Sequence, residues 1–481
     1  METVKGSVSV VLALTVTLIL SFCMILVESA RENTMLLKSD AVFNTGIQCL
    51  MAEYHKLLWE DFDLMYVDAS YGMTYPEYER MKAHLYDYID HNLSFGNDGW
   101  LALEYIGAQV YKVVLATDAG GKDFFEQATE AAKEAVGISY IEQILYWLKQ
   151  TEATGYMESV IAEEMEMVSG QIENVNGTQV EVKEAVWGTD KNGEPIILEE
   201  AEYQTVDIEN PLNNISYDGS FLVRQVLGEA GCVPGCRIEI QSLGSERRLA
   251  TGDGMDETES AGSENALEEL KEKAFFCKYL LDHFATYTDV CYGKADELEG
   301  ILQYPLEYII GGSSSDMENL EKVMGQLLLI REVDNYLYLL QDEVRTIEAE
   351  VIGDSIAAAA AVPWLGPVVT QALLLFWAYE DSISDLKQLF QGERIPLIKA
   401  LKMTDDIEFA LNYEQYLVLL LMFIQKDRLI WRSMDMIEMM VRTEQANFRM
   451  DGCISRATFS GIFRDRYGKQ YMVSDKLQYF E

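Results

Sequence analysis

The run GSVSVVLALTVTLILSFCMILV at residues 6–27 decides the fold, because its 22 residues contain no charged side chain. An α-helix rises about 1.5 Å per residue, so a helix of this length crosses a bilayer hydrocarbon core about 30 Å thick. A cleaved signal peptide has a shorter apolar run and small residues before the cut. The candidate cleavage site after Ala30 instead has Glu28 where a small residue is required. The pattern therefore predicts that residues 1–30 are a retained transmembrane helix.

The charges that flank this helix predict its orientation. Lys5 and the amino terminus oppose Glu2 on the short side, and Arg31 begins the side that carries the rest of the chain. The short side has the more positive balance, and positive residues favour the cytoplasm. We expect a single-pass protein of the cell membrane with a cytoplasmic N-terminus and an extracytoplasmic body.

Beyond the transmembrane helix, apolar side chains recur at the spacing of an amphipathic helix. In residues 36–58 they are separated by steps of one helical turn or two, with polar residues between them. No proline intervenes before Pro76, so we expect the transmembrane helix to continue as a stalk to about residue 60. Residues 76–171 are also helical by pattern. The stalk and first helical region are predicted to occupy residues 31–171.

Two stretches interrupt the helical pattern. Residues 179–206 (QVEVKEAVWGTDKNGEPIILEEAEYQTV) alternate apolar and polar side chains around a KNG turn, which predicts a β-hairpin within an insertion at residues 172–244. Residues 245–265 (SERRLATGDGMDETESAGSEN) are poor in large apolar groups, which predicts a flexible acidic linker. Helical periodicity returns from Ala266 to Phe448, and the C-terminal helical region is predicted to occupy residues 266–481. We therefore expect a mainly α fold with a minor α+β element.

Residues 355–379 (SIAAAAAVPWLGPVVTQALLLFWAY) form a second charge-free stretch, 25 residues long. Insertion of this stretch into the membrane would return the C-terminal part of the chain to the cytoplasm. Pro363 and Pro367 interrupt it, however, and each proline weakens a spanning helix because it removes a backbone donor. We favour two helices in the protein core, with Trp364 and Trp377 packed against neighbouring helices.

The chain is strongly acidic, with 80 Asp and Glu residues against 37 Lys and Arg residues and a formal net charge of −43 at pH 7. A surface of this charge repels nucleic acid phosphates and anionic lipid headgroups, so we expect no nucleic acid partner. The usual role of such acidity is a solvated surface that resists aggregation, and a specific cation site is the alternative.

The seven cysteines are scattered along the chain and do not form the framework of a small disulfide-rich domain. Cys232 and Cys236 flank a Pro-Gly turn in CVPGC, and they are close enough in sequence for a local disulfide outside the cytoplasm. The spacing differs from the CxxC of redox enzymes, and two free thiols are the alternative to a structural disulfide. Both alternatives stay open at this point.

Candidate catalytic and metal-binding residues are few. His84, Asp87 and His91 are spaced i, i+3 and i+7, so on a helix they share one face and form a weak candidate metal site. Surface or core histidines are the more common explanation. Glu307 and Glu380 lie among aromatic and apolar neighbours, where burial raises the pKa of a carboxyl. Because the sequence contains no GxSxG, HExxH or complete phosphate-binding motif, we expect no catalytic residues, no cofactor and no enzyme activity.

The chain contains the segments KGSVSVVLAL, AEYHKLLWEDFDLMYVDASYG, LQYPLEYIIGG and FWAYEDSISDLKQLFQGERIPLIK, which are distributed over most of its length. Together they resemble a clostridial membrane-protein domain family of unknown function. Members of that family accompany genes for Tad-type pili and secretion-like machinery, and their N-termini resemble the pseudopilins TadE and TadG. The resemblance implies a structural or assembly component of a Tad-like pilus or secretion system, with pilus assembly components as its protein partners.

One position departs from the pilin pattern. Pilin-type signals carry Glu five residues after the glycine at which they are cut, whereas Val11 stands at that distance from Gly6. We therefore expect the leader to be retained. A membrane-tethered extracytoplasmic binding or sensor module is the alternative function, in which the acidic body would supply a cation or ligand site.

Overall fold

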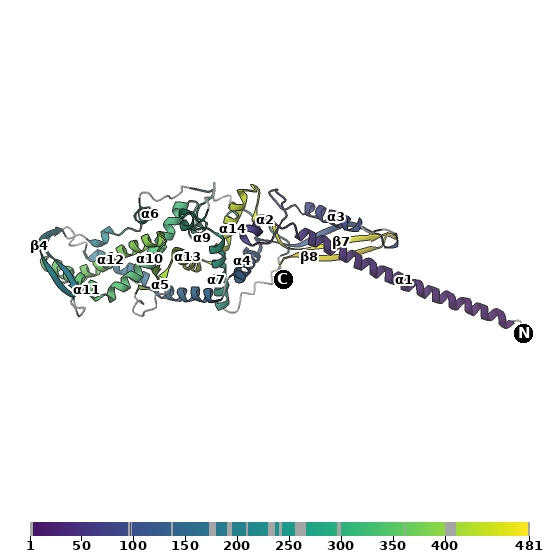
Figure 1. Cartoon of the computed structure of the whole chain (residues 1–481), viewed down its shortest axis with the longest axis horizontal. Coiled ribbons are helices and arrows are strands. Elements are labelled where there is room, and N and C mark those ends of the chain that lie inside the picture. Colours follow the sequence, from purple (N-terminus) through teal and green to yellow (C-terminus); the bar gives the residue numbers. More distant parts are fainter. Residues whose placement is uncertain are drawn as a thin grey trace. The chain divides into compact units, whose positions relative to one another are not determined.

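The structure is a computed structural model of the whole chain (Figure 1). It describes residues 3–94, 97, 99–135, 138–172, 179–189, 195–207, 210–228, 236–239, 243–254, 266–295, 300–360, 362–399 and 410–479. The fold is mainly helical, with a long apolar N-terminal helix and small antiparallel sheets, as predicted. The helices are α1 (Thr3–Met51), α2 (Lys56–Phe62), α3 (Tyr78–Ser94), α4 (Lys122–Ala135), α5 (Ile138–Ile172), α6 (Gly219–Leu227), α7 (Ala266–His283), α8 (Tyr287–Cys291), α9 (Pro305–Gly311), α10 (Asp316–Gln341), α11 (Glu343–Ala359), α12 (Leu365–Phe390), α13 (Tyr413–Phe423) and α14 (Lys426–Arg442). The strands are β1 (Val67–Asp68), β2 (Leu103–Leu115), β3 (Gln179–Thr189), β4 (Pro195–Asp207), β5 (Ile395–Pro396), β6 (Ala410–Leu411), β7 (Cys453–Asp465) and β8 (Gln470–Gln478).

The chain divides into two compact units, each assembled from separate stretches of sequence. Unit 1 comprises Met1–Ala128, Leu243–Gly262 and Ile437–Glu481, and unit 2 comprises Thr129–Ser242 and Ser263–Met436. These units are a different division from the consecutive segments of the sequence analysis, since unit 1 joins the first and the last stretches of the chain.

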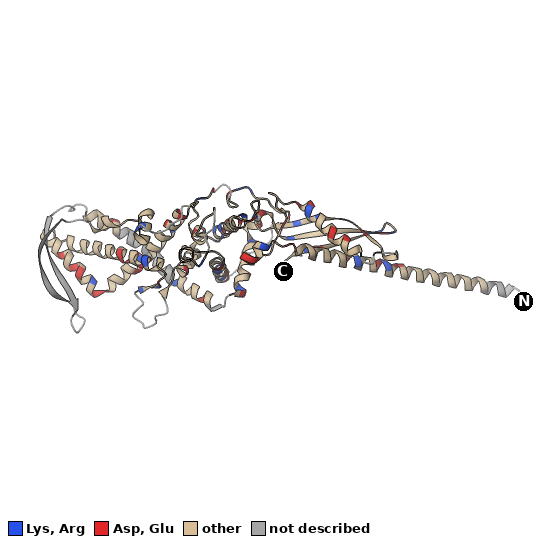
Figure 2. Ribbon diagram, turned by 45° about the horizontal axis from the view of Figure 1, so that its top comes forward, with Lys and Arg blue, Asp and Glu red and all other residues tan. Residues whose placement is uncertain are grey.

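α1 is one continuous helix that begins in the apolar run and continues past it, as predicted. Figure 2 shows no charged residue along the tan stretch of α1 that follows its grey tip. The helix ends at Met51, and the prediction of a stalk to about residue 60 is wrong at this end. Tyr54 instead forms a bridge with Val67, and the backbone N–H of His55 donates to the carbonyl of Tyr66 at 2.8 Å. These contacts with the sheet replace the next turn of α1.

Unit 1 is built on a four-stranded antiparallel sheet in which β7 pairs with β1, β2 and β8. α1 contacts β8, α3 contacts β2, and the two helices contact each other. In β8 the buried residues Tyr471 and Val473 alternate with Met472, which is 70% exposed. The helices therefore cover one face of the sheet and leave the other face of β8 open to solvent.

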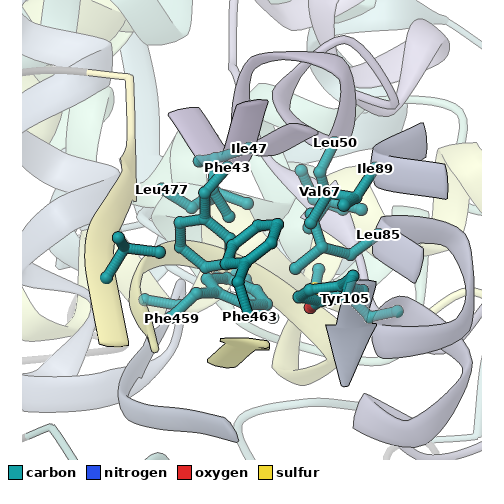
Figure 3. Close-up of a cluster of buried hydrophobic side chains, with 14 of the residues drawn as sticks. Phe43, Ile47, Leu50, Val67, Leu85, Ile89, Tyr105, Phe459, Phe463 and Leu477 are labelled. Carbon is teal, nitrogen blue, oxygen red and sulfur yellow. The ribbon is translucent and has the colours of Figure 1, made fainter. Parts of the chain in front are cut away.

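The core of unit 1 lies between the sheet and these two helices (Figure 3). The rings of Phe43 on α1 and Phe463 on β7 meet edge to face, with their centroids 6.4 Å apart. Gly461 on β7 allows this approach, because a Cβ there would collide with the Phe43 ring. Burial of each large apolar side chain contributes about 1.5–3 kcal/mol. The buried residues include Phe43, Ile47 and Leu50 of α1, Leu85 and Ile89 of α3, and Tyr105, Phe459, Phe463 and Leu477 of the strands.

None of the four strands of the unit 1 sheet was predicted. Residues 103–115 form β2, so the expectation of helix throughout residues 76–171 is wrong there. The strand is rich in Val and Tyr, but its register shifts next to Gly107 and again before Val114. These bulges break the alternation of apolar and polar residues that identifies a strand in a sequence. β7 and β8 follow the helices of the C-terminal region and were missed as well.

Unit 2 contains helices that pack side by side, and α12 contacts α5, α10 and α11. Residues 355–379 form the end of α11 and the first half of α12. Leu365, Ala372 and Leu375 of this stretch are buried within unit 2, which confirms the prediction of two helices in the protein core. Pro367 lies in the first turn of α12, where a helix tolerates proline.

The two tryptophans of this stretch have different surroundings. Trp377 packs against the cluster of buried side chains that contains Val333 and Tyr336 of α10, as predicted. Trp364 is 54% exposed, so the prediction that it packs against a neighbouring helix is wrong. It lies at the N-cap of α12, outside the buried face of that helix.

The predicted β-hairpin is present, because β3 and β4 pair in antiparallel fashion from Gln179 opposite Asp207 to Thr189 opposite Pro195. Of the predicted linker, residues 245–254 are described and form part of unit 1. The backbone N–H of Gly254 donates to the carbonyl of Val113 at 2.9 Å. Residues 255–265 lie outside the described residues.

The close packing of α1 on α3 depends on Gly46, where a Cβ would lie 2.8 Å from Ile89 Cγ1 and 3.1 Å from Leu85 Cδ1. We predict that Gly46→Val lowers the free energy of unfolding by about 1–3 kcal/mol, the usual cost of overpacking a core. Thermal unfolding of the detergent-solubilised full-length protein measures this loss. The matched control is Gly325→Val on α10, where a Cβ meets no atom within 4 Å and helix propensity predicts no loss. Equal losses in the two variants would contradict the packing argument.

Candidate functional site

The first candidate feature is the apolar half of α1. The helix from Ser9 onward contains a window with a mean hydropathy of 2.9, and none of that window is buried. The large apolar side chains from Val10 to Val27 are 45% to 72% exposed. Within the part of the chain that the structure describes, α1 is the one helix long and apolar enough to cross a membrane.

The apolar half of α1 ends where the helix meets the β7–β8 hairpin. Arg31 is 5% exposed, and its guanidinium donates to Glu28 (2.7 Å) and to Asp465 Oδ2 (3.1 Å). One residue further along α1, Glu32 forms an ion pair with Lys469 at 2.5 Å. These contacts attach the helix to the end of the sheet. We call Glu28, Arg31, Glu32, Asp465 and Lys469 the junction.

Asp465 also organises the turn between β7 and β8. Its Oδ1 accepts the backbone N–H groups of Tyr467 and Lys469, both at 2.9 Å, and its Oδ2 accepts the hydroxyl of Tyr471 at 3.2 Å. Burial acts to raise the pKa of Asp465, but the Lys469 N–H and the Arg31 guanidinium together lower it. A single charged carboxylate therefore joins the turn to the helix.

Unit 2 contains a buried ionic network centred on Arg331 of α10, whose side chain has no exposed surface. Its guanidinium donates to Asp385 on α12 at 2.9 and 3.0 Å and pairs with Asp334 at 2.8 Å. It also donates to the carbonyls of Pro396 (2.9 Å) and Leu397 (3.1 Å). The network therefore connects α10, α12 and the segment around β5.

Lys399 completes this network. Its Nζ lies 2.9 Å from Asp385 Oδ2, and its backbone N–H donates to Asp334 at 2.9 Å. Burial raises the pKa of Asp334, whereas Arg331 and Lys399 overcome the effect of burial on Asp385 and lower its pKa. Two carboxylates face two cations, so the network is neutral overall and stabilises the packing of the helices.

Glu307 of α9 is a fully buried carboxyl group. Its Oε1 accepts the hydroxyl of Tyr413 and the backbone N–H of Tyr287, both at 2.8 Å, whereas its Oε2 has no hydrogen-bond partner among the described residues. Burial raises the pKa of Glu307 to about 7, as the sequence suggested. Glu380 is exposed on α12, so the expectation of burial is wrong for that residue.

The three residues of the candidate metal site lie on α3, as the spacing predicted. His84 is half-buried, and its Nδ1 lies 3.0 Å from Glu53 Oε1 on the following turn beyond α1, while Asp87 and His91 are exposed. Across the described ranges, no three His, Cys, Asp or Glu side chains are grouped in a way that could hold a metal ion. The structure therefore adds no support for a metal at these residues.

The possible disulfide between Cys232 and Cys236 stays a prediction. Cys236 is described and half-buried, but Cys232 lies outside the described residues.

Neither the junction nor the Arg331 network was predicted from the sequence. A signal for the network was present, because Arg331, Asp334 and Asn335 interrupt the apolar run LLLIREVDNYLYLL, and charges inside such a run are usually paired when buried. The junction had no local signal, since Arg31 and Asp465 are 434 positions apart.

Comparison with known proteins identifies a family for part of the chain. The sequence model of a family of unknown function, DUF5702, matches residues 201–464, which are more than half of the 481 residues. The match includes the Arg331 network and begins after α1. No curated protein and no solved structure matches the chain. The resemblance to a family of unknown function is thereby confirmed, and its clostridial origin and association with Tad-type pili stay predictions.

We predict that Asp465→Asn lowers the free energy of unfolding by about 2 kcal/mol at pH 7, because buried Arg31 then keeps only Glu28 of its two charged partners. The pKa of Asp465 is lowered in the fold, so the wild-type carboxylate stabilises above the ordinary value of 3.8 and this stabilisation is lost as the pH falls below it. Urea unfolding of the detergent-solubilised full-length protein measures both effects. The matched control is Glu104→Gln, whose pair with Arg464 is exposed and contributes less than about 1 kcal/mol. A loss in the control as large as that of Asp465→Asn would refute the role of the junction.

A second prediction concerns pH. The pKa of Glu307 is about 7 in the fold and 4.5 ordinarily, so its contribution to stability decreases as the pH rises from 4.5 to 7. The difference in the free energy of unfolding between Glu307→Gln and wild type should shift in favour of the variant between about pH 5 and about pH 8. The expected shift is up to about 3 kcal/mol. Urea unfolding at both pH values measures the difference. Glu380→Gln is the exposed control, and a wild-type pH dependence in Glu307→Gln would show that the buried carboxyl does not titrate as described.

Proposed function

The chain belongs to DUF5702, a family of unknown function, and we propose that it is a non-enzymatic, single-pass membrane protein with a structural or assembly role. In this proposal residues 1–30 cross the cell membrane, with the N-terminus in the cytoplasm and the body outside. The body is then a rigidly mounted component of a Tad-like pilus or secretion system.

The observation that carries the proposal is the continuity of α1. Its apolar half is exposed, and its other half supplies Phe43, Ile47 and Leu50 to the core of unit 1. A helix that is both a membrane span and a core element cannot reorient relative to unit 1 without unfolding it. A freely reorienting binding module would need a flexible linker at this point. Rigid mounting therefore favours a structural role.

The amount of exposed apolar surface supports the membrane span. Thirteen large apolar side chains between Val10 and Val27 are exposed along one helix. Burial of such side chains contributes about 1.5–3 kcal/mol each, so covering all of them contributes on the order of 20–40 kcal/mol. Contiguous apolar surface of this size is covered by lipid or protein in the cell. Its length, close to the thickness of a bilayer core, favours lipid.

The ionisable clusters of the described residues support a non-enzymatic role. Groups that transfer protons in catalysis must reach a substrate. Arg331, Asp385 and Lys399 are instead closed in a neutral network, and Glu307 is fully buried among the helices of unit 2. The network is accounted for by the packing that it stabilises, and the burial of Glu307 keeps this carboxyl away from a substrate in solvent.

A membrane-tethered binding or sensor module is the second candidate. The net charge of −43 favours it, because an acidic surface attracts cations and cationic ligands.

We predict that Leu14→Arg combined with Leu18→Arg makes the full-length protein extractable from membranes by alkaline carbonate. Two arginines at the centre of a spanning helix cost about 5–7 kcal/mol. The matched control is Leu36→Arg combined with Leu37→Arg, which lie beyond the span on the same helix and are 46% and 69% exposed. The control should stay in the pellet with the wild type. Wild-type protein in the soluble fraction, or equal extraction of both double variants, would refute the span.

The same variants separate assembly from sensing in cells that carry the gene. If the role is assembly, cells without the protein and cells with the Leu14 and Leu18 double variant should lose surface pili, and the Leu36 and Leu37 double variant should restore them. Electron microscopy counts the pili. Unchanged pili together with altered transcription would exclude assembly and favour the sensor module.

A further inference from the structure

We infer that the turn between β7 and β8, residues 466–469, is a second membrane contact that enters the phospholipid headgroup layer beside α1. In this arrangement Arg466 binds lipid phosphates and Tyr467 lies between the apolar and polar layers. The inference goes beyond the proposed function and rests on its claim that residues 6–27 span the bilayer. It holds for either orientation of the helix, since both leaflets have a headgroup layer.

The main support for the inference is the position of the turn, which lies beside α1 just beyond the apolar run. Val27 ends the apolar run, and Arg31 lies about 6 Å further along the helix. The headgroup layer extends about 5–8 Å beyond the hydrocarbon core on each side. The Arg31 side chain points back toward the membrane, because it donates to Glu28, and its guanidinium carbon lies 4.8 Å from the centre of the Tyr467 ring. Tyr467 is therefore held at headgroup depth.

The turn cannot leave this depth without breaking the junction. Asp465 binds Arg31 with one carboxylate oxygen and holds the backbone of the turn with the other. Lys469 pairs with Glu32 at the other end of the turn. The turn therefore moves with α1 as one body.

The exposed side chains of the turn fit a headgroup layer. Tyr467 is 66% exposed although its ring packs on Arg31, and tyrosine is enriched where membrane meets water. Arg466 is exposed and makes no ion pair or hydrogen bond with any residue in the described ranges. Its guanidinium can therefore donate to a phosphate without giving up a protein partner.

The residues around the turn carry no net charge, so the repulsion of anionic lipids that the composition predicts does not apply at the turn. The chain as a whole carries −43, which disfavours contact with anionic lipids. At this end of unit 1 the charges balance, because α1, β2, β7 and the turn contribute equal numbers of acids and bases. They are Glu28, Glu32, Glu104 and Asp465 against Arg31, Arg464, Arg466 and Lys469.

The test measures the depth of the turn in the full-length protein. A fluorescent aromatic amino acid replaces Tyr467 and, in a separate chain, Met73 as the matched control. Met73 is 50% exposed. Four residues before it, the backbone N–H of Ala69 donates to the carbonyl of Gly452, which directly precedes β7. Met73 and Tyr467 therefore lie near opposite ends of β7, and the length of that strand separates the two probes by about 40 Å. The protein is reconstituted in phosphatidylcholine vesicles with about 30% phosphatidylglycerol, and lipids with a nitroxide on the headgroup quench the probe.

We expect several-fold stronger quenching of the probe at position 467 than of the probe at position 73. We also expect Arg466→Gln to remove the share of the quenching at position 467 that depends on phosphatidylglycerol. Equal quenching at the two positions in vesicle-bound protein would overturn the headgroup contact and leave the membrane span intact. Shifted emission at Tyr467 without quenching would show that protein, such as a second copy of the chain, covers the turn, and would also overturn the contact. Protein that does not float with the vesicles would overturn the span and this inference together.

Discussion

The burial of one half of α1 against the four-stranded sheet is the contact on which the rest of unit 1 depends. Phe43, Ile47 and Leu50 join the helix to strands that come from both ends of the chain. Two small residues make the approach possible, since Gly46 admits α3 and Gly461 admits the Phe43 ring. Because the described side chains of the apolar half of α1 are exposed, this core and the junction together decide how the apolar segment is attached to the body.

The two halves of α1 are adapted to two different solvents. In the first half apolar side chains surround the helix, as expected where every side meets hydrocarbon. In the second half the buried side chains form one stripe, which includes Phe43, Ile47 and Leu50, and the opposite side faces water. The change occurs at the junction, where Arg31 is removed from solvent by Glu28 and Asp465. A charge so close to the apolar run remains favourable because Arg31 is paired both with Glu28 on the same helix and with Asp465 on the sheet.

The residues matched by the family model belong to both units. The matched residues 201–464 include the Arg331 network of unit 2 and reach into β7, the central strand of unit 1. They therefore contain Phe463 of β7, which meets Phe43 of α1, but neither β8 nor α1 itself. In unit 2 the helices are stabilised by apolar burial together with paired charges, and removing one partner from such a pair leaves an uncompensated charge that costs several kcal/mol, about 3–5 in measured cases.

The sequence by itself determined the features that depend on neighbouring residues. These are the apolar span at residues 6–27, the β3–β4 hairpin and the helical character of most of the chain, because composition and periodicity within one element reveal them. Only the tertiary structure decided which residues far apart in the chain meet. The strand at residues 103–115, the exposure of Trp364 and the pairing of Arg31 with Asp465 belong to this second group. Their physical cause is long-range contact, which leaves no periodic trace in the local sequence.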